Sequence, residues 1–169
     1  MLEKTMLVKD SSFRKLDDPF ENTNSKKYVF YVKIDDVAEG IPMATNPRDQ
    51  KLTSNVAKAI TDSLESNDGY FHLKNRGIVI SAKKVNYNNK TGKVTIYFDN
   101  NTYHGNIDGG HTYKIVCDHI GENLDQYVQF EVMTGVEDII ESLAEARNTS
   151  VQVDEKSMAE LAQKFDPIK

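Results

Sequence analysis

Residues 103–121, YHGNIDGGHTYKIVCDHIG, place a glycine pair between a strand-like segment and a helix-like segment. Four apolar residues follow the pair at the spacing i, i+3, i+4 and i+7: Tyr113, Val116, Cys117 and Ile120. This spacing predicts one buried stripe of a helix, and Gly121 is a typical residue for its C-terminal end. The stretch therefore predicts a strand, a glycine turn and a helix in succession.

Strand and helix patterns continue on both sides of this stretch. Runs of β-branched and aromatic residues predict strands at residues 28–34, 77–82 and 127–133, and alternation predicts a hairpin over 85–98. Helical spacing predicts three further helices, whose apolar positions are Leu52, Val56, Ala59, Ile60 and Leu64; Val136, Ile140 and Leu143; and Met158, Leu161, Ala162 and Phe165. Elements in this order predict an α+β fold, a mixed β-sheet with flanking helices.

Domain organisation is inferred from the chain length and from the polar N-terminal segment. The 169 residues are enough to bury one sizeable core. Residues 1–26 are polar and rich in turn-forming residues, so we expect an N-terminal arm followed by a single α+β domain over residues 27–169. A final helical pattern with nothing after it to pack against suggests a fragment of a longer protein.

Composition and charge exclude several classes of protein. The net charge of −5 argues against a dedicated binder of duplex nucleic acid, which usually carries a basic face. No apolar run approaches the roughly 18 residues of a membrane span, and the charged N-terminus is not a signal peptide. The single cysteine, Cys117, is compatible with a reducing compartment. We therefore expect a cytoplasmic protein that does not enter a membrane.

The glycine turn over residues 108–112 has two interpretations. A helix that begins after a glycine turn points unpaired N–H groups outward, and its dipole adds about half a positive charge, which favours an anion such as phosphate. Asp108 would cap this helix or face a ligand hydroxyl or a metal, and His111 and Thr112 lie in the first turn. The spacing matches neither the dinucleotide fingerprint nor the P-loop. A plain turn with an aspartate cap is the structural alternative.

A family resemblance adds weight to the ligand interpretation. The segment IDGGHTYKIV resembles the Asp-Gly-Gln-His-Arg type of loop in the ParB and sulfiredoxin superfamily, which implies a ParB/sulfiredoxin-like core whose loop and following helix hold a nucleotide's phosphates. Four segments in order resemble the AIPR proteins, the abortive-infection phage-resistance family: NPRDQ at 46–50, GYFHLKNRGIVISAKKV at 69–85, NIDGGHTY at 106–113 and EARNTSVQVDEKSMAEL at 145–161.

Three signatures of the AIPR family match in part. The residues that match are Phe71, Asn75, Gly77 and Ile78 in the first signature, Gly109 and Thr112 in the second, and Asn148 and Val151 in the third. Asp108 and His111 stand where the second signature has asparagine and glutamine. Thr112 stands where the Asp-Gly-Gln-His-Arg loop has arginine, so the loop itself lacks a phosphate-binding arginine.

Two arginines and two asparagines complete the predicted ligand set. The apolar stripe of the helix that follows residue 136 extends to Arg147, whose planar fork suits phosphate and would replace the missing loop arginine. A cap of the helix dipole is the alternative role for Arg147. The family match implies ligand contacts for Asn75 and Arg76, which a turn would also explain. Asn148 matches a family position and is also a typical helix C-cap.

The histidines and the cysteine do not predict a metal or redox site. His111 and His119 lie about 12 Å apart along a helix and cannot share one ion. No ligand spacing of a known metal site appears, so no metal ligands are predicted. Cys117 lies on the apolar stripe, outside the glycine motif that carries the reactive cysteine of sulfiredoxin-like proteins, so reduction of a sulfinic acid is not expected.

Three functions remain open, and the sequence does not decide whether the domain is an enzyme. The first is a phage-defence domain that binds a nucleotide, with Mg²⁺, through the predicted ligand set: Asn75, Arg76, Asp108, Gly109, Gly110, His111, Thr112, Arg147 and Asn148. The second is a non-enzymatic recognition module for DNA or for a phage or host protein, and the acidic composition favours a protein. The third is a ParB-like nuclease, for which Asp108 and His111 are the candidates.

Overall fold

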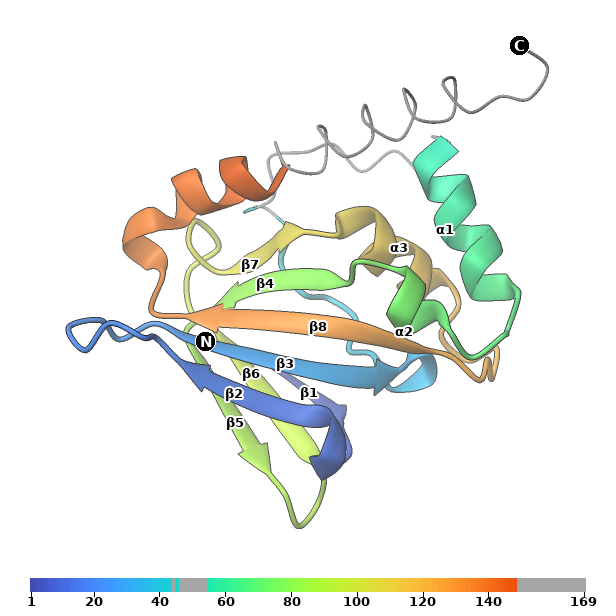
Figure 1. Cartoon of the computed structure of the whole chain (residues 1–169), viewed down its shortest axis with the longest axis horizontal. Helices are drawn as coiled ribbons and strands as arrows, with labels where there is room; N and C mark the ends of the chain where they lie inside the picture. The colour runs from blue at the N-terminus through green and yellow to red at the C-terminus, as the bar shows by residue number, and fades with distance from the viewer. Residues whose placement is uncertain (44, 46–54, 149–169) are drawn as a thin grey trace.

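The computed structural model describes residues 1–43, 45 and 55–148, which form two β-sheets with helices beside them (Figure 1). The strands are β1 (Leu2–Leu7), β2 (Phe13–Asp17), β3 (Lys26–Lys33), β4 (Ile78–Ala82), β5 (Lys84–Asn88), β6 (Lys93–Phe98), β7 (Gly105–Asp108) and β8 (Tyr127–Thr134). The helices are α1 (Asn55–Glu65), α2 (Phe71–Lys74), α3 (Gly110–Asp118), a helix over residues 140–148, and the short 3-10 helices η1 (Asp10–Ser12), η2 (Ile34–Asp36) and η3 (Glu137–Ile139). This mixture confirms the predicted α+β class.

Strand pairing divides the strands into two sheets. The three-stranded sheet has the order β1-β6-β5 and is antiparallel. The five-stranded sheet has the order β2-β3-β8-β4-β7, in which β8 and β4 pair in parallel and the other pairs are antiparallel. This sheet is mixed, as predicted. Its central strand, β8, is the last described strand of the chain.

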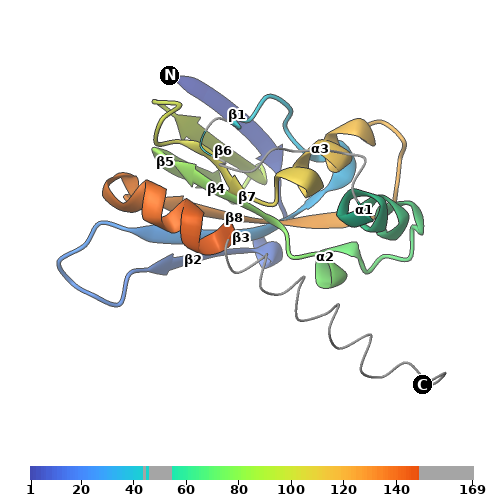
Figure 2. The same cartoon turned by 90° about the horizontal axis from the view of Figure 1, so that it is seen from above.

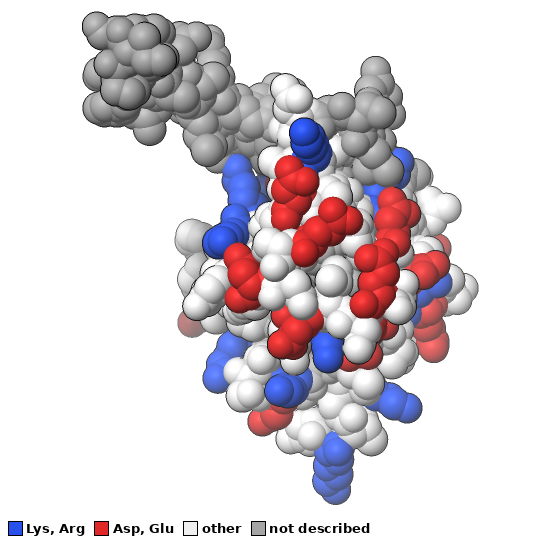
Figure 3. All heavy atoms as spheres, turned by 90° about the vertical axis from the view of Figure 1, so that its right-hand side faces the viewer, with Lys and Arg blue, Asp and Glu red and all other residues white. Residues whose placement is uncertain are grey.

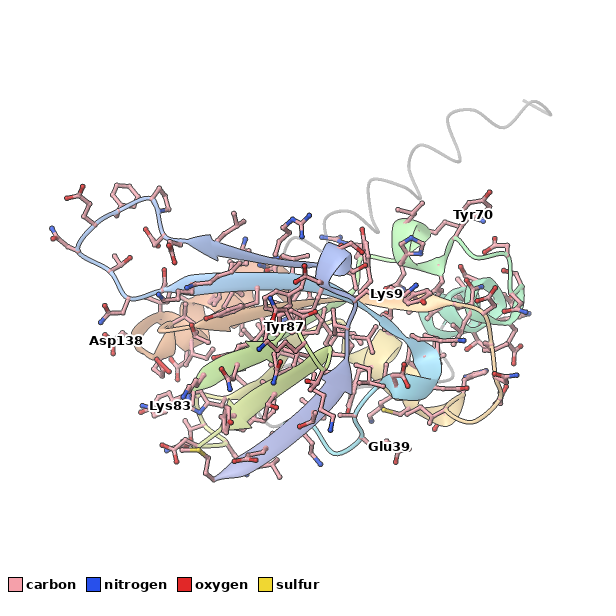
Figure 4. All side chains as sticks on the ribbon, turned by 90° about the horizontal axis from the view of Figure 1, so that it is seen from below. Lys9, Glu39, Tyr70, Lys83, Tyr87 and Asp138 are labelled. Atoms are coloured by element: carbon pink, nitrogen blue, oxygen red, sulfur yellow. The ribbon has the colours of Figure 1, made fainter. Side chains whose placement is uncertain are left out.

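The larger hydrophobic core lies between the two sheets. Phe30 of β3 and Phe130 of β8 stack with 5.7 Å between ring centroids, and Phe13 of β2 stacks on Phe30 at 5.8 Å. From the other sheet, Tyr87 of β5, labelled in Figure 4, stacks on Phe13 at 4.2 Å. Because full burial of one such side chain contributes roughly 1.5–3 kcal/mol, this aromatic row is a main link between the sheets.

A smaller core covers the opposite face of the five-stranded sheet, called the outer face below. Its buried members are Val79, Ile107, Met133, Val136, Ile140 and Ala144. Ile140 and Ala144 lie four residues apart on one face of helix 140–148, which packs on residues of β4, β7 and β8 through this core (Figure 2). The predicted helical stripe after residue 136 is therefore confirmed. Burial of this stripe against Ile107 holds the helix beside β7.

One buried glutamine joins the ends of α1 and α2. The Gln126 side chain is fully buried; its Nε2 donates to the Leu64 carbonyl oxygen at 3.2 Å. Its Oε1 accepts from the N–H groups of Gly69 and Phe71 at 3.1 and 3.3 Å. These backbone groups lie at a helix end and a helix start, where the helices themselves offer no partner. Gln126 therefore positions the start of α2 and the loop that precedes it.

A histidine at the end of α3 ties this helix to α1. Nδ1 of His119 lies 2.7 Å from the Ile115 carbonyl oxygen, and Nε2 lies 3.0 Å from Oε2 of Glu65. Both oxygens only accept hydrogen bonds, so the ring satisfies both partners when both nitrogens carry protons. Burial lowers the pKa of His119, whereas the hydrogen bonds to Ile115 and Glu65 raise it, and the resulting pKa lies above its ordinary value.

The raised pKa of His119 predicts a pH-dependent stability. A folded-state pKa above the unfolded one stabilises the fold at acidic pH, and this contribution is lost as pH rises through the folded-state pKa. We expect the difference in free energy of unfolding between wild type and His119→Gln to be largest below about pH 6.5, the ordinary pKa of histidine, and to shrink above it. Urea denaturation over a pH series measures it. The pH dependence should weaken in a Glu65→Gln background, and a pH-independent difference in the wild-type background would contradict the assignment.

The start of the chain differs from the predicted N-terminal arm. Residues 2–7 and 13–17 form β1 and β2, which pair with β6 and β3. Both are edge strands, so most of their side chains face solvent and the sequence looks like surface loop. Met6 and Val8 are nevertheless buried, and they belong to the core between the sheets.

Some predicted segments lie outside the described residues. These are Leu52, the NPRDQ segment at 46–50 and the helix expected over 158–165. In the described part of α1, Ala57 and Leu64 are buried, whereas Ala59, predicted on the buried stripe, is exposed. The hairpin predicted over 85–98 is confirmed as β5 and β6, although it belongs to a different sheet from β4.

Candidate functional site

The glycine turn forms the start of α3. Gly109 is the N-cap residue, with φ 75° and ψ 24°, and its carbonyl oxygen accepts the first helical hydrogen bond from the Tyr113 N–H at 3.0 Å. Oδ1 of Asp108 accepts the Gly109 N–H at 2.9 Å. Asp108 therefore binds the N–H of the cap residue and is not itself the N-cap. Glycine has no side chain, so no side-chain cap is made at this helix start, where Gly110 and Thr112 are buried.

The conformation of Gly109 is required by a close backbone contact. A Cβ at position 109 would fall on the carbonyl oxygen of Gly77, deep within van der Waals distance. Gly77, with φ 90°, is itself pressed against β8, because its Cβ would lie 2.7 Å from the Gln129 carbonyl oxygen. Both glycines thus have a packing role: they bring the α3 turn against the start of β4, and β4 against β8.

Asn75 connects the loop after α2 to the first turn of α3. Its Nδ2 lies 3.1 Å from Oγ1 of Thr112, and its Oδ1 accepts the Gly77 N–H at 2.7 Å. Arg76 lies between these residues and is exposed. Two segments of the predicted ligand set are therefore in direct contact, and the Thr112 hydroxyl bonds the Asn75 side chain.

The end of helix 140–148 reaches the same region from the outer face. Nδ2 of Asn148 donates to the carbonyl oxygens of Ala144 at 2.6 Å and of Ile107, the neighbour of Asp108, at 3.3 Å. Asn148 is 5% exposed, and its Oδ1 is buried without a hydrogen-bond partner among the described residues. The Ile107 contact places Asn148 beside the end of β7.

Arg147 binds Glu131, a carboxylate outside the predicted ligand set. Its Nη2 donates to Oε2 of Glu131 at 2.7 Å, and Nζ of Lys27 lies 4.0 Å from the same oxygen. Glu131 is on the outer face of β8, where its side chain is 15% exposed. In the sequence it occupies a polar position of an alternating strand, as Gln129 does, so no signal distinguished it. The guanidinium that was expected to complete the glycine loop is thus directed toward β8.

The strand register brings the two ends of this region together. Val79 of β4 pairs with Asp108 on one side and with Glu131 on the other. Asp108 and Glu131 are therefore two strands apart across Val79, with Asn148 and Arg147 bound beside them. All three predicted segments, 75–77, 108–112 and 147–148, meet at this end of β4 and β7. We call this group of residues the β4–β7 cluster.

A comparison with protein-family models gives a match over residues 43–169 to the model described as AIPR protein. The chain belongs to the AIPR family. Membership implies a function related to phage defence. Searches of curated proteins and of solved structures gave no match.

The AIPR match contains every residue of the β4–β7 cluster but begins after β3. Strands β1, β2 and β3 therefore precede the matched range, although they supply the edge of one sheet and two strands of the other. The part of the fold that the AIPR model covers is completed by these N-terminal strands, which also supply Lys27 to the Glu131 ion pair.

Histidine and carboxylate side chains in this AIPR chain form pairs. Nδ1 of His104 accepts the N–H groups of Asp99 and Asn100, so its Nε2 carries the proton that Glu137 accepts at 3.0 Å. In residues 1–43, 45 and 55–148, no group of three or more His, Cys, Asp and Glu side chains is arranged to hold a metal ion. Over the same residues, no helix combines the length and apolar character needed to cross a membrane.

The face that carries α1 is acidic. Figure 3 shows Asp and Glu side chains gathered on this face. Exposed carboxylates of α1, α3 and the loop after α3 are Asp62, Glu65, Asp118, Glu122 and Asp125. This field opposes the approach of a long polyanion such as duplex DNA to that face.

Proposed function

We propose that this AIPR-family chain takes part in phage defence by binding a nucleotide or another phosphate-containing ligand at the Gly109–Gly110 loop. One observation carries the proposal: Gly109 begins α3 in a left-handed conformation, without a side-chain cap, next to the Asn75–Thr112 pair. A helix start of this kind favours an anion through its N–H groups and its dipole. The proposal includes a ParB/sulfiredoxin-like core, to whose phosphate-binding loop the glycine loop of this chain is similar.

Charge around the loop favours a nucleotide with Mg²⁺ over a bare phosphate. Arg76 is exposed on the loop that contacts Thr112 and supplies a guanidinium where the helix turn itself has none. Asp108 lies beside the N–H groups of the turn, and its carboxylate repels an unaccompanied phosphate. A magnesium ion bound to the phosphates would relieve this repulsion, since Mg²⁺ is commonly held by one or two carboxylates plus phosphate oxygens.

Thermal unfolding in the presence of nucleotides tests the proposal. A ligand that binds the native state raises stability by RT ln(1 + [L]/Kd), so we expect at least one nucleoside triphosphate, diphosphate or monophosphate to raise the Tm. The rise should be larger with Mg²⁺ than with a chelator. A well-folded sample whose Tm moves with none of these ligands at millimolar concentration would overturn the proposal.

Arg76→Ala is expected to weaken binding of the active nucleotide by about 10- to 100-fold, since a charge-assisted hydrogen bond contributes roughly 1.5–3 kcal/mol. Isothermal titration calorimetry measures the change. Arg14→Ala is the matched control, because Arg14 is an exposed arginine on β2 that donates to its local backbone at Asp10 and Phe13. Equal affinities for the Arg76 and Arg14 variants would remove Arg76 from the site.

A further inference from the structure

The edge of the five-stranded sheet at β2 is a candidate surface for association. β2 is a terminal strand of this sheet, so among residues 1–43, 45 and 55–148 one side of its backbone has no partner strand (Figure 1). Phe13 is partly buried, whereas the other four residues of the strand are exposed. Unpaired strand edges are templates for pairing with another chain, and proteins usually block them with charges. The arrangement of the charges on β2 therefore decides what this edge can pair with.

An apolar groove runs beside this edge on the outer face. Leu16, 58% exposed, lines a groove of about 340 Å³ together with residues of the β2–β3 turn and of the region around η3. The apolar lining residues are Leu16, Pro19, Met133, Val136, Ile139 and Leu143. Ile139 is 53% exposed. A strand added at the edge of β2 would place its own side chains next to this groove.

The two faces of β2 differ in chemistry. Phe13 stacks on Phe30 and Tyr87 between the sheets, so alternation directs Lys15 and Asp17 to the same inner side. Arg14 and Leu16 then face outward, as the position of Leu16 in the groove also requires. Residues directly opposite each other in an antiparallel pair share a face. A second copy of β2 can therefore pair only in registers that place outward residues opposite outward residues.

Four antiparallel self-pairings, each centred on one of β2 residues 14–17, meet this condition. They differ in which charged side chains they place opposite each other. Centring the two-fold axis on Arg14, on Lys15 or on Asp17 places that residue opposite its own copy, which brings like charges together. Centring it on Leu16 places Leu16 opposite Leu16, and each Lys15 opposite Asp17 of the other copy. Like charges directly opposite destabilise a strand pair and unlike charges stabilise it. Charges that block pairing with an unrelated strand are thus complementary to a second copy of this one.

We propose that two copies of this chain associate antiparallel through β2 in the register centred on Leu16, joining their five-stranded sheets into one. Such an interface is isologous, because the same surface patch is used twice. It exchanges backbone hydrogen bonds along one short strand and covers both Leu16 side chains. The buried surface is small, so the dimer is weak and its population depends on protein concentration.

Charge reversal tests the pairing in solution. Sedimentation-equilibrium experiments on the wild type should show a monomer–dimer equilibrium. Lys15→Asp and Asp17→Lys should each weaken self-association by about tenfold or more, because each creates two like-charge pairs across the interface. Mixing the two variants should restore the dimer, since the Lys15→Asp copy and the Asp17→Lys copy are complementary. Both positions are exposed, and circular dichroism of each variant checks that the fold is intact.

Cysteine substitution tests the register. Leu16→Cys should form a disulfide-linked dimer under mild oxidation, because directly opposite residues in an antiparallel pair lie within disulfide range. Lys15→Cys is the matched control and should cross-link far less, as wild-type protein with Cys117 alone should. A wild type that stays monomeric at every concentration would overturn the proposal. So would a dimer that is insensitive to both charge reversals, or preferential cross-linking through position 15.

Discussion

Replacing Gly109 by alanine is expected to lower the free energy of unfolding by about 3 kcal/mol or more. Two costs add together. An L-residue at φ 75° occupies the left-handed region, and its Cβ would fall on the carbonyl oxygen of Gly77. The clash is with backbone on both sides, so it cannot be relieved by rotating a side chain. Urea denaturation of the variant measures the loss.

Gly121→Ala is the matched control for Gly109→Ala. Gly121 also has a positive φ, of 93°, but a Cβ built there meets no described atom within 4 Å. The control therefore has only the backbone cost, about 1–2 kcal/mol. The difference between the two variants isolates the contact of the α3 turn with β4. Equal losses would show that the turn has room for a side chain and that its packing against Gly77 is not tight.

Gln126→Leu is expected to cost about 2–4 kcal/mol, because it leaves the buried Phe71 N–H and the Gly69 N–H without their acceptor. The Leu64 carbonyl oxygen loses its donor in the same substitution. The volume change is small, so the loss reports on hydrogen bonding and not on a cavity. Chemical denaturation at a single pH is sufficient for the measurement.

Gln129→Leu provides the comparison for Gln126→Leu, because it makes the same chemical change on the half-buried outer face of β8. We expect a loss there of about 0.5 kcal/mol or less, as for other surface substitutions. If both substitutions had the same effect, the buried glutamine would not be the link between α1 and α2. Hydrogen exchange at the Gly69 and Phe71 amides would then be unaffected in Gln126→Leu, whereas we expect it to accelerate.

The sequence predicted elements whose side-chain period is set by burial of one face. β3, β8 and the β5–β6 hairpin alternate because one face of each meets the core, and α3 has one apolar stripe for the same reason. β1 and β2 were missed because edge strands expose most of their side chains. The neighbours of β8 were not predictable, because periodicity describes which face is buried and not which strand lies alongside.

The candidate site, too, could be predicted from the sequence only in part. Local chemistry and family resemblance pointed to the segments that meet at the β4–β7 cluster, and Asn75 and Thr112 are in contact there. The role of Gly109 could be only half predicted: a positive φ follows from the turn, whereas the contact with Gly77 depends on long-range packing. Glu131 was missed because its partner, Arg147, is 16 residues away in the sequence and on another element.

The central place of β8 has a consequence for how the chain acquires its structure during synthesis. β8 separates β2 and β3 from β4 and β7, so before residue 134 has emerged from the ribosome the five-stranded sheet exists only as two unconnected strand pairs. Two-stranded pieces of this kind are at best marginally stable in water. The sheet therefore closes only when β8 joins both halves at once, and until then the nascent chain exposes apolar strand faces.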